Sequence, residues 1–86
     1  MSAQYAYFYL MGNDGIGVGE AVSDHVAYWR GLDMDDYIGG PFEDRTGGLI
    51  TFRAEGIRRA KGAVASDPFV ALGLVKAYWL KGWLPE

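Results

Sequence analysis

The chain has 86 residues, a formal net charge of -3 and no cysteine, and 50% of its residues are hydrophobic. This length fits a single domain (residues 1–86), and the acidic balance disfavours a nucleic-acid-binding protein, whose domain is normally basic. The lack of cysteine excludes disulfides and thiolate metal sites, and no apolar run is long enough to cross a membrane. Because no basic stretch followed by an apolar core opens the sequence, we expect a cytoplasmic protein.

The first predicted element is a strand over Ala3–Met11, which is rich in aromatic residues. Alternation places three tyrosines on one face and an apolar set on the other. The segment Gly12–Gly19 that follows is rich in glycine, as a nucleotide-binding loop would be. The third glycine of G-x-G-x-x-G, counted from Gly15 and Gly17, falls on Glu20, so we interpret this segment as a flexible turn.

The next predicted element is an amphipathic helix that ends near Leu32. Its apolar positions repeat at helical spacing and should form one buried face: Val18, Val22, His25, Trp29 and Leu32. His25 is the only histidine of the chain, and histidine changes its charge in the physiological pH range. Any function based on an imidazole therefore depends on His25.

The second half of the sequence predicts strands over Tyr37–Phe42, Leu49–Ala54 and Leu74–Leu84. Between the last two lies a helix over Glu55–Ser66, whose buried face should be formed by Ile57, Ala60 and Val64. Asp67 and Pro68 suit the N-cap and the first position of a new helical turn. The order β-α-β-β-α-β predicts an α+β, ferredoxin-like sandwich: a four-stranded antiparallel sheet with two helices on one face.

The predicted sheet has a second face that no helix covers. Both side-chain sets of the first strand are apolar or aromatic, and a large exposed aromatic surface favours aggregation. Pairing with a second copy would cover this surface. We therefore expect a homodimer through the open sheet face.

Four aspartates that flank the second predicted strand suggest a cation site at first sight: Asp33, Asp35, Asp36 and Asp44. A calcium loop of the EF-hand type beginning at Asp33 would need Gly at position 38 and Glu at position 44, but these are Ile38 and Asp44. A solvated loop explains the cluster better. We expect no metal and no organic cofactor.

A histidine becomes an effective general base when a carboxylate holds its ring. Asp67 is the candidate partner of His25, because its place after the second helix could bring it to the first helix. The residues alone leave two other interpretations open. His25 could be a packed core residue, and Asp67 could be only a helix cap.

Several segments together resemble the YCII (YciI-like) family: His25-Val26-Ala27-Tyr28, Gly40-Pro41-Phe42 with Asp44 and Gly47-Gly48, and Asp67-Pro68-Phe69-Val70 followed by Gly73-Leu74. The resemblance spans nearly the whole chain. It implies a ferredoxin-like fold assembled as a dimeric α/β barrel, with the family's active-site histidine and aspartate at His25 and Asp67. The short turn at Glu43–Gly48 departs from the family pattern, as do Trp29, Trp79 and Trp83.

With this resemblance the sequence predicts a small cofactor-independent enzyme that eliminates from, or isomerises, a small cyclic or aromatic-derived substrate. His25 would remove a proton, and Asp67 would hold the imidazole and offset its charge. The candidate substrate-binding residues are Trp29, Phe42, Phe69 and Tyr7, and Tyr5 and Tyr9 share the edge of Tyr7 in the expected pocket wall; each of these could instead serve only in packing. Two alternatives stay open: a non-catalytic module that binds a small ligand or a protein on the same barrel, and an oxygen-dependent monooxygenase.

Overall fold

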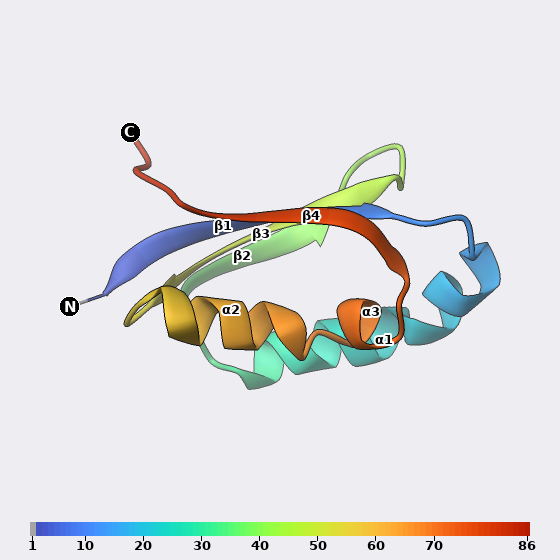
Figure 1. Cartoon of the computed structure of the whole chain (residues 1–86), viewed down its shortest axis with the longest axis horizontal. Helices are drawn as coiled ribbons and strands as arrows, with labels where there is room; N and C mark the ends of the chain where they lie inside the picture. Colours follow the sequence, from blue (N-terminus) through green and yellow to red (C-terminus); the bar gives the residue numbers. More distant parts are fainter. Residues whose placement is uncertain (1) are drawn as a thin grey trace.

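The computed structural model describes residues 2–86, and its secondary structure forms two layers (Figure 1). One layer is a sheet, and the helices cover one of its faces. The elements in chain order are β1 (Ala3–Met11), α1 (Gly15–Gly31), β2 (Asp35–Pro41), β3 (Gly47–Ala54), α2 (Ile57–Ala65), α3 (Pro68–Ala71) and β4 (Val75–Gly82).

The sheet has the strand order β2-β3-β1-β4, and every neighbouring pair is antiparallel. β1 is central because its alternating aromatic residues suit a strand with a neighbour on each side. Tyr7 pairs with Ile50 of β3 and with Leu80 of β4. The α+β ferredoxin-like prediction is therefore confirmed, with the short helix α3 added before β4.

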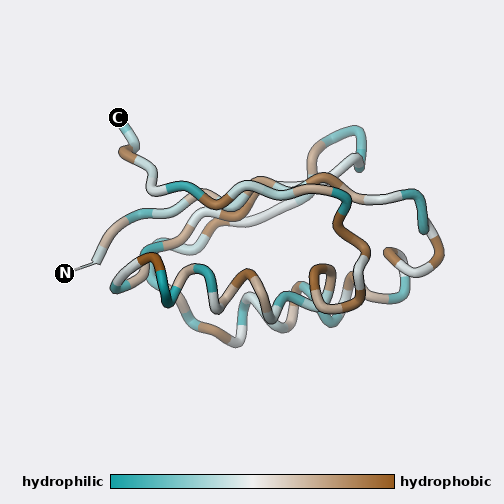
Figure 2. The backbone as a smooth tube through the Cα atoms, viewed as in Figure 1, coloured by the Kyte–Doolittle hydropathy of each residue, from teal (hydrophilic) through white to brown (hydrophobic). Residues whose placement is uncertain are grey.

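The two faces of the sheet differ in burial. Paired residues of antiparallel strands share a face, so the register separates the two sets. Under the helices lie the buried Tyr5, Tyr7 and Tyr9 of β1 with Ile50 and Phe52 of β3. Figure 2 shows hydrophobic segments in both layers of the molecule. The opposite face is open and carries large, partly exposed apolar side chains: Phe8, Leu49 and Trp79.

Helix α1 begins earlier than the glycine-rich sequence suggests. The side chain of Asp14 accepts a hydrogen bond of 2.8 Å from the amide of Gly17. This N-cap satisfies a free donor of the first turn, so the chain is already helical from Gly15. The prediction of a flexible turn is wrong over Gly15–Gly19.

The buried residues of α1 are Ala21, His25 and Trp29, which lie four apart. Val22 is 44% exposed, so its predicted burial is wrong. The helix contacts the core through the stripe that contains the small Ala21, and Val22 lies at the edge of that stripe. The buried face of α2 also differs from the prediction. Ala60, Ala63 and Val64 are buried, but Ile57, the first residue of the helix, is 42% exposed, so its predicted burial is wrong.

Strand limits differ from the predictions by a few residues. β2 covers Asp35–Pro41 rather than Tyr37–Phe42, and β4 covers Val75–Gly82 rather than Leu74–Leu84. Between residues 2 and 86, no helix combines the length and apolar character needed to cross a membrane.

Candidate functional site

His25 and Asp67 form a buried hydrogen-bonded pair. His25 lies on the inner face of α1, and Asp67 is the N-cap of α3, where Pro68 starts the helix. The Nδ1 of His25 lies 2.7 Å from the Oδ1 of Asp67. The same oxygen accepts a hydrogen bond of 2.9 Å from the amide of Phe69. Asp67 is therefore both a helix cap, as predicted, and the partner of His25.

The second oxygen of Asp67 is held by two aromatic side chains. The Nε1 of Trp29 donates to Oδ2 at 3.1 Å, and the hydroxyl of Tyr7 donates to it at 3.4 Å. Asp67, Tyr7 and Trp29 have no exposed surface. A carboxylate buried without partners would be strongly unfavourable, and these donors offset its desolvation.

The donors around Asp67 favour its ionised form and with it one tautomer of His25. The indole N–H of Trp29 and the amide of Phe69 can only donate, so Asp67 must accept at both of its oxygens. A carboxylate that accepts at Oδ1 requires the proton of neutral His25 to be on Nδ1. The lone pair of His25 is then on Nε2, which is the nitrogen a general base uses.

The hydroxyl of Tyr9 lies 3.5 Å from the Nε2 of His25. Gly48 makes this position available, because a Cβ at residue 48 would collide with the Tyr9 hydroxyl. Burial raises the pKa of Tyr9 to about 12, and the negative charge of Asp67 and then Tyr37 add to the effect. Tyr9 is therefore protonated at neutral pH and can donate a hydrogen bond to His25 or to a bound molecule.

The rings of His25 and Phe69 stack with centroids 4.0 Å apart and an angle of 11° between their planes. Phe69 lies two residues after Asp67, so one short segment supplies both the partner of Nδ1 and the surface against the ring. The imidazole is consequently fixed in position, orientation and tautomer.

A cavity of about 330 Å³ opens beside this pair. Its wall includes His25, Tyr9 and Phe69, together with residues of α1, of β2 and of the turn between β2 and β3. Small-molecule sites usually measure roughly 300–1,000 Å³, so this cavity suits a ligand of about one ring. Gly39 lies on its β2 side, where a Cβ would come within 3.0 Å of Ile50.

The predicted site residues occupy three different places. His25 and Phe69 line the cavity, and Asp67 lies behind His25. Tyr7 and Trp29 are fully buried and are absent from the cavity wall; both contact Asp67 instead. Phe42 lies apart from the other five, with its ring centroid 5.1 Å from that of Phe8, and it lines a separate hollow at the β2–β3 turn.

The sequence places Tyr9 in the expected pocket wall, where it lies, but does not mark it as the neighbour of His25, and it does not mark Arg30 or Arg45 as cavity residues. Tyr9 shares the face of Tyr7, so the alternation of β1 was a usable signal. Arg30 and Arg45 both line the cavity. No local pattern marks Arg45, because the cavity wall is built from segments that lie far apart in the sequence.

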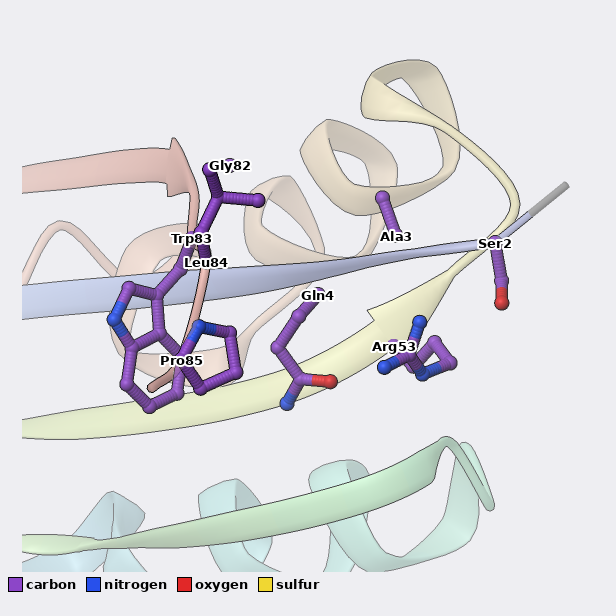
Figure 3. A pocket seen from close by; sticks show the side chains of 8 residues that line it. All are labelled: Ser2, Ala3, Gln4, Arg53, Gly82, Trp83, Leu84 and Pro85. Carbon is purple, nitrogen blue, oxygen red and sulfur yellow. The ribbon is translucent and has the colours of Figure 1, made fainter.

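A larger hollow of about 580 Å³ lies near the two chain ends (Figure 3). It is lined by residues of β1, β3 and the C-terminal segment, including Gln4, Arg53 and Trp83. The backbone N–H of Trp83 donates to the carbonyl of Gln4 at 2.9 Å, and Arg53 pairs with Asp36 at 3.2 Å. None of the candidate acid–base residues lies there. Among residues 2–86, no three His, Cys, Asp or Glu side chains come close enough to hold a metal ion.

No protein-family profile and no curated protein sequence matches the chain. Solved structures do match its fold. The 5-chloro-2-hydroxyhydroquinone dehydrochlorinase TftG from Burkholderia phenoliruptrix AC1100, in complex with 2,5-dihydroxybenzoquinone, superposes with a TM-score of 0.80 at 22% identity over 94% of this chain and 93% of that chain.

Two further structures extend the comparison. Protein SO0527 from Shewanella oneidensis gives a TM-score of 0.64 at 11% identity over 95% of this chain and 88% of its own. A putative antibiotic biosynthesis monooxygenase from Bacteroides thetaiotaomicron gives a TM-score of 0.55 at 12% identity over 98% of this chain and 89% of its own. At these identities the likeness establishes the fold alone, which is the ferredoxin-like fold of dimeric α/β-barrel proteins.

Proposed function

We propose that this chain is a YCII-like, cofactor-independent enzyme that moves a proton on a small cyclic or aromatic-derived substrate. One observation carries the proposal: His25 is held through Nδ1 by a buried carboxylate and lines a cavity large enough for one ring. That arrangement is the one a general base needs. Phe69 is the proposed substrate contact, whereas Tyr7 and Trp29 act as positioning residues through Asp67.

In the proposed step the Nε2 of His25 takes a proton from a carbon or hydroxyl of the substrate. The electron pair released then expels a leaving group, which gives elimination, or shifts a double bond, after which the imidazolium returns the proton to a different carbon, which gives isomerisation. Asp67 stabilises the imidazolium that forms, and the hydroxyl of Tyr9 is placed to donate to an oxygen that gains negative charge. This step uses only side chains of the chain itself.

The fold neighbour TftG supports the choice of reaction class. It is a dehydrochlorinase, and its structure holds 2,5-dihydroxybenzoquinone, a single substituted ring. Loss of hydrogen chloride from a ring is one form of the elimination described above, with His25 taking the proton and chloride leaving with its bonding electrons. The size of the cavity in this chain fits a molecule of that kind.

The test follows chloride release from 5-chloro-2-hydroxyhydroquinone and, in parallel, exchange of acidic C–H groups of small cyclic acids with deuterium from solvent. We expect catalysis of at least one of the two by the wild type. His25→Gln should lower the rate about 10²–10⁴-fold, and Arg58→Gln, on the exposed side of α2, should leave it unchanged. Activity that survives His25→Gln would contradict the proposal.

A second candidate function is a binding module without catalysis. Two observations favour it. His25 is only 7% exposed, and the cavity wall is mainly apolar. The two candidates differ in what His25→Gln does. A binding module would keep its affinity for ring compounds and show no turnover in any variant, whereas the enzyme loses turnover while it still binds.

We also propose that the open sheet face pairs with a second copy of the chain. Phe8, Leu49 and Trp79 are 39%, 40% and 47% exposed on that face. The ring of Phe8 packs against Trp79 with centroids 5.4 Å apart, so these side chains form one continuous apolar surface. Such a surface on a small domain marks an interface, and closed two-fold pairing buries it on both copies.

A further inference from the structure

The cavity beside His25 has a charge opposite to that of the whole chain. The chain carries a formal net charge of -3, yet Arg30 and Arg45 line this cavity and no aspartate or glutamate does. Asp67 is close by, but it has no exposed surface and lies behind His25. A molecule that enters the cavity therefore meets two permanent positive charges.

Neither guanidinium has a protein partner among the residues that the structure describes. No ion pair or hydrogen bond joins the side chain of Arg30 or Arg45 to another residue between 2 and 86. Arg53 provides a contrast, because its guanidinium pairs with Asp36 at 3.2 Å. Five donors on each of the two cavity arginines are thus available to a ligand.

The turn that carries Arg45 is ordered by its own hydrogen bonds. The Oδ1 of Asp44 accepts from both the amide and the hydroxyl of Thr46, at 3.1 and 2.7 Å. The amide of Arg45 donates to the carbonyl of Phe42 at 3.0 Å. Arg45 itself has a φ of 65°, a left-handed conformation that favours glycine and costs energy for other residues. A flexible polar residue is held there in spite of that cost.

The two arginines come from different elements. Arg30 is in the last turn of α1, five residues after His25, and Arg45 is in the β2–β3 turn. The same wall includes the apolar side chains of Val26, Pro41 and Phe69. The same cavity therefore offers a surface for a ring, two cations for an anionic group and one general base.

We infer that the substrate of this site is a cyclic or aromatic carboxylate, whose ring lies on the apolar wall and whose carboxylate binds Arg30 and Arg45. Guanidinium and carboxylate groups form charge-assisted, often paired hydrogen bonds that set orientation as well as affinity. Binding of the carboxylate would direct the rest of the ring toward His25. This inference rests on the cavity of the proposed function and requires no turnover to be tested.

The experiment compares benzoate with benzamide, which has nearly the same shape and no charge. Dissociation constants come from NMR titrations that follow the ring protons of His25 in the wild type and in Arg30→Gln, Arg45→Gln and the double variant. We expect the wild type to prefer benzoate by about tenfold at low salt. The double variant should bind the two probes equally, and Arg58→Gln should keep the preference.

Two further measurements separate the contributions. Inorganic phosphate, which has charge but no ring, should fail to displace benzoate at equal concentration, because the apolar wall supplies part of the affinity. Added salt should reduce the preference for benzoate. Equal binding of the two probes by the wild type, no saturable binding of either, or an unchanged preference in the double variant would overturn the inference.

The result is independent of catalysis. His25→Gln, titrated through its backbone amide signals because it has no histidine ring, should keep the preference for benzoate, since the anion is bound by the arginines and not by the imidazole. A preference for benzoate in a chain that catalyses no proton transfer would contradict the proposed enzyme and leave the carboxylate site standing. Proton transfer in a chain without a preference for benzoate would contradict the carboxylate site and leave the proposed enzyme standing.

Discussion

The indole N–H of Trp29 donates a hydrogen bond of 3.1 Å to the Oδ2 of Asp67. Trp29 is fully buried, so its Nε1 binds the carboxylate while its ring packs in the core. The hydroxyl of Tyr7 reaches the same oxygen from β1. The partner of His25 is thus fixed by the sheet and by α1 together.

Trp29→Phe removes the indole donor and part of the buried volume. We expect it to lower the free energy of unfolding by about 2–4 kcal/mol, because Oδ2 of Asp67 loses a donor and the smaller ring leaves a cavity. Urea denaturation measures the change. Trp83→Phe is the matched control, since Trp83 is 43% exposed, and it should shift stability by less than about 0.5 kcal/mol. Equal effects of the two substitutions would contradict this role of Trp29.

Asp67→Asn replaces a pure acceptor by a group with one acceptor and one donor. Whichever way the amide turns, its NH₂ faces either the amide of Phe69 or the indole N–H of Trp29, so donor meets donor. We expect a loss of about 2–4 kcal/mol of stability. In the wild type, ¹⁵N NMR of the single histidine should show the proton of the neutral ring on Nδ1, and in the variant a mixture of tautomers.

Asp24→Asn is the control for this variant, because Asp24 is an exposed carboxylate on the same helix. It should change neither the tautomer nor the stability. An Asp67→Asn protein with the wild-type tautomer and stability would show that the pair does not hold the ring.

Tyr9→Phe should make the protein less sensitive to alkali. The pKa of Tyr9 is raised from 10.0 to about 12 by burial first and then by Asp67 and Tyr37. Between these two values the unfolded chain has lost the proton and the folded chain keeps it. This contribution to stability is full below pH 10 and is lost as the pH rises through 12, by about 1.4 kcal/mol per pH unit for one group.

Denaturation across this range should therefore give a shallower loss of stability for Tyr9→Phe than for the wild type. Because Tyr7 is also buried and its pKa is raised as well, part of the slope should remain. Identical slopes for the two proteins would mean that Tyr9 does not titrate as the structure implies.

Trp79→Lys should convert a dimer into a monomer. The substitution places a charge in the apolar surface formed with Phe8, and desolvating that charge opposes association. Light scattering after size-exclusion chromatography should report twice the chain mass for the wild type and the chain mass for the variant. Leu84→Lys, at a residue that is 88% exposed, is the control and should stay dimeric. A monomeric wild type would rule out this interface.

Much of the fold was accessible from local patterns in the sequence. Alternation in β1 and β3, the Asp67-Pro68 start of α3 and the helical repeat around His25 each predict their element, because backbone preferences and side-chain direction act over a few residues. The same patterns misplaced Val22 and Ile57. Periodicity gives the direction of a face, but the width of the buried stripe depends on what packs against it.

The composition of the site was decided by the tertiary structure. Asp67 is contacted by residues at positions 7, 25, 29 and 69, which come from three elements and are separated from it by up to 60 residues in the sequence. Arg30 and Arg45 line one cavity although 15 positions separate them in the sequence, because the tertiary structure brings residues of α1, β2 and the β2–β3 turn to the same wall. The sequence by itself determined the strands, the helices and a single histidine on an inner face. Which side chains surround that histidine depended on the packing of helices against the sheet, since non-local contacts leave no periodic signal in the chain.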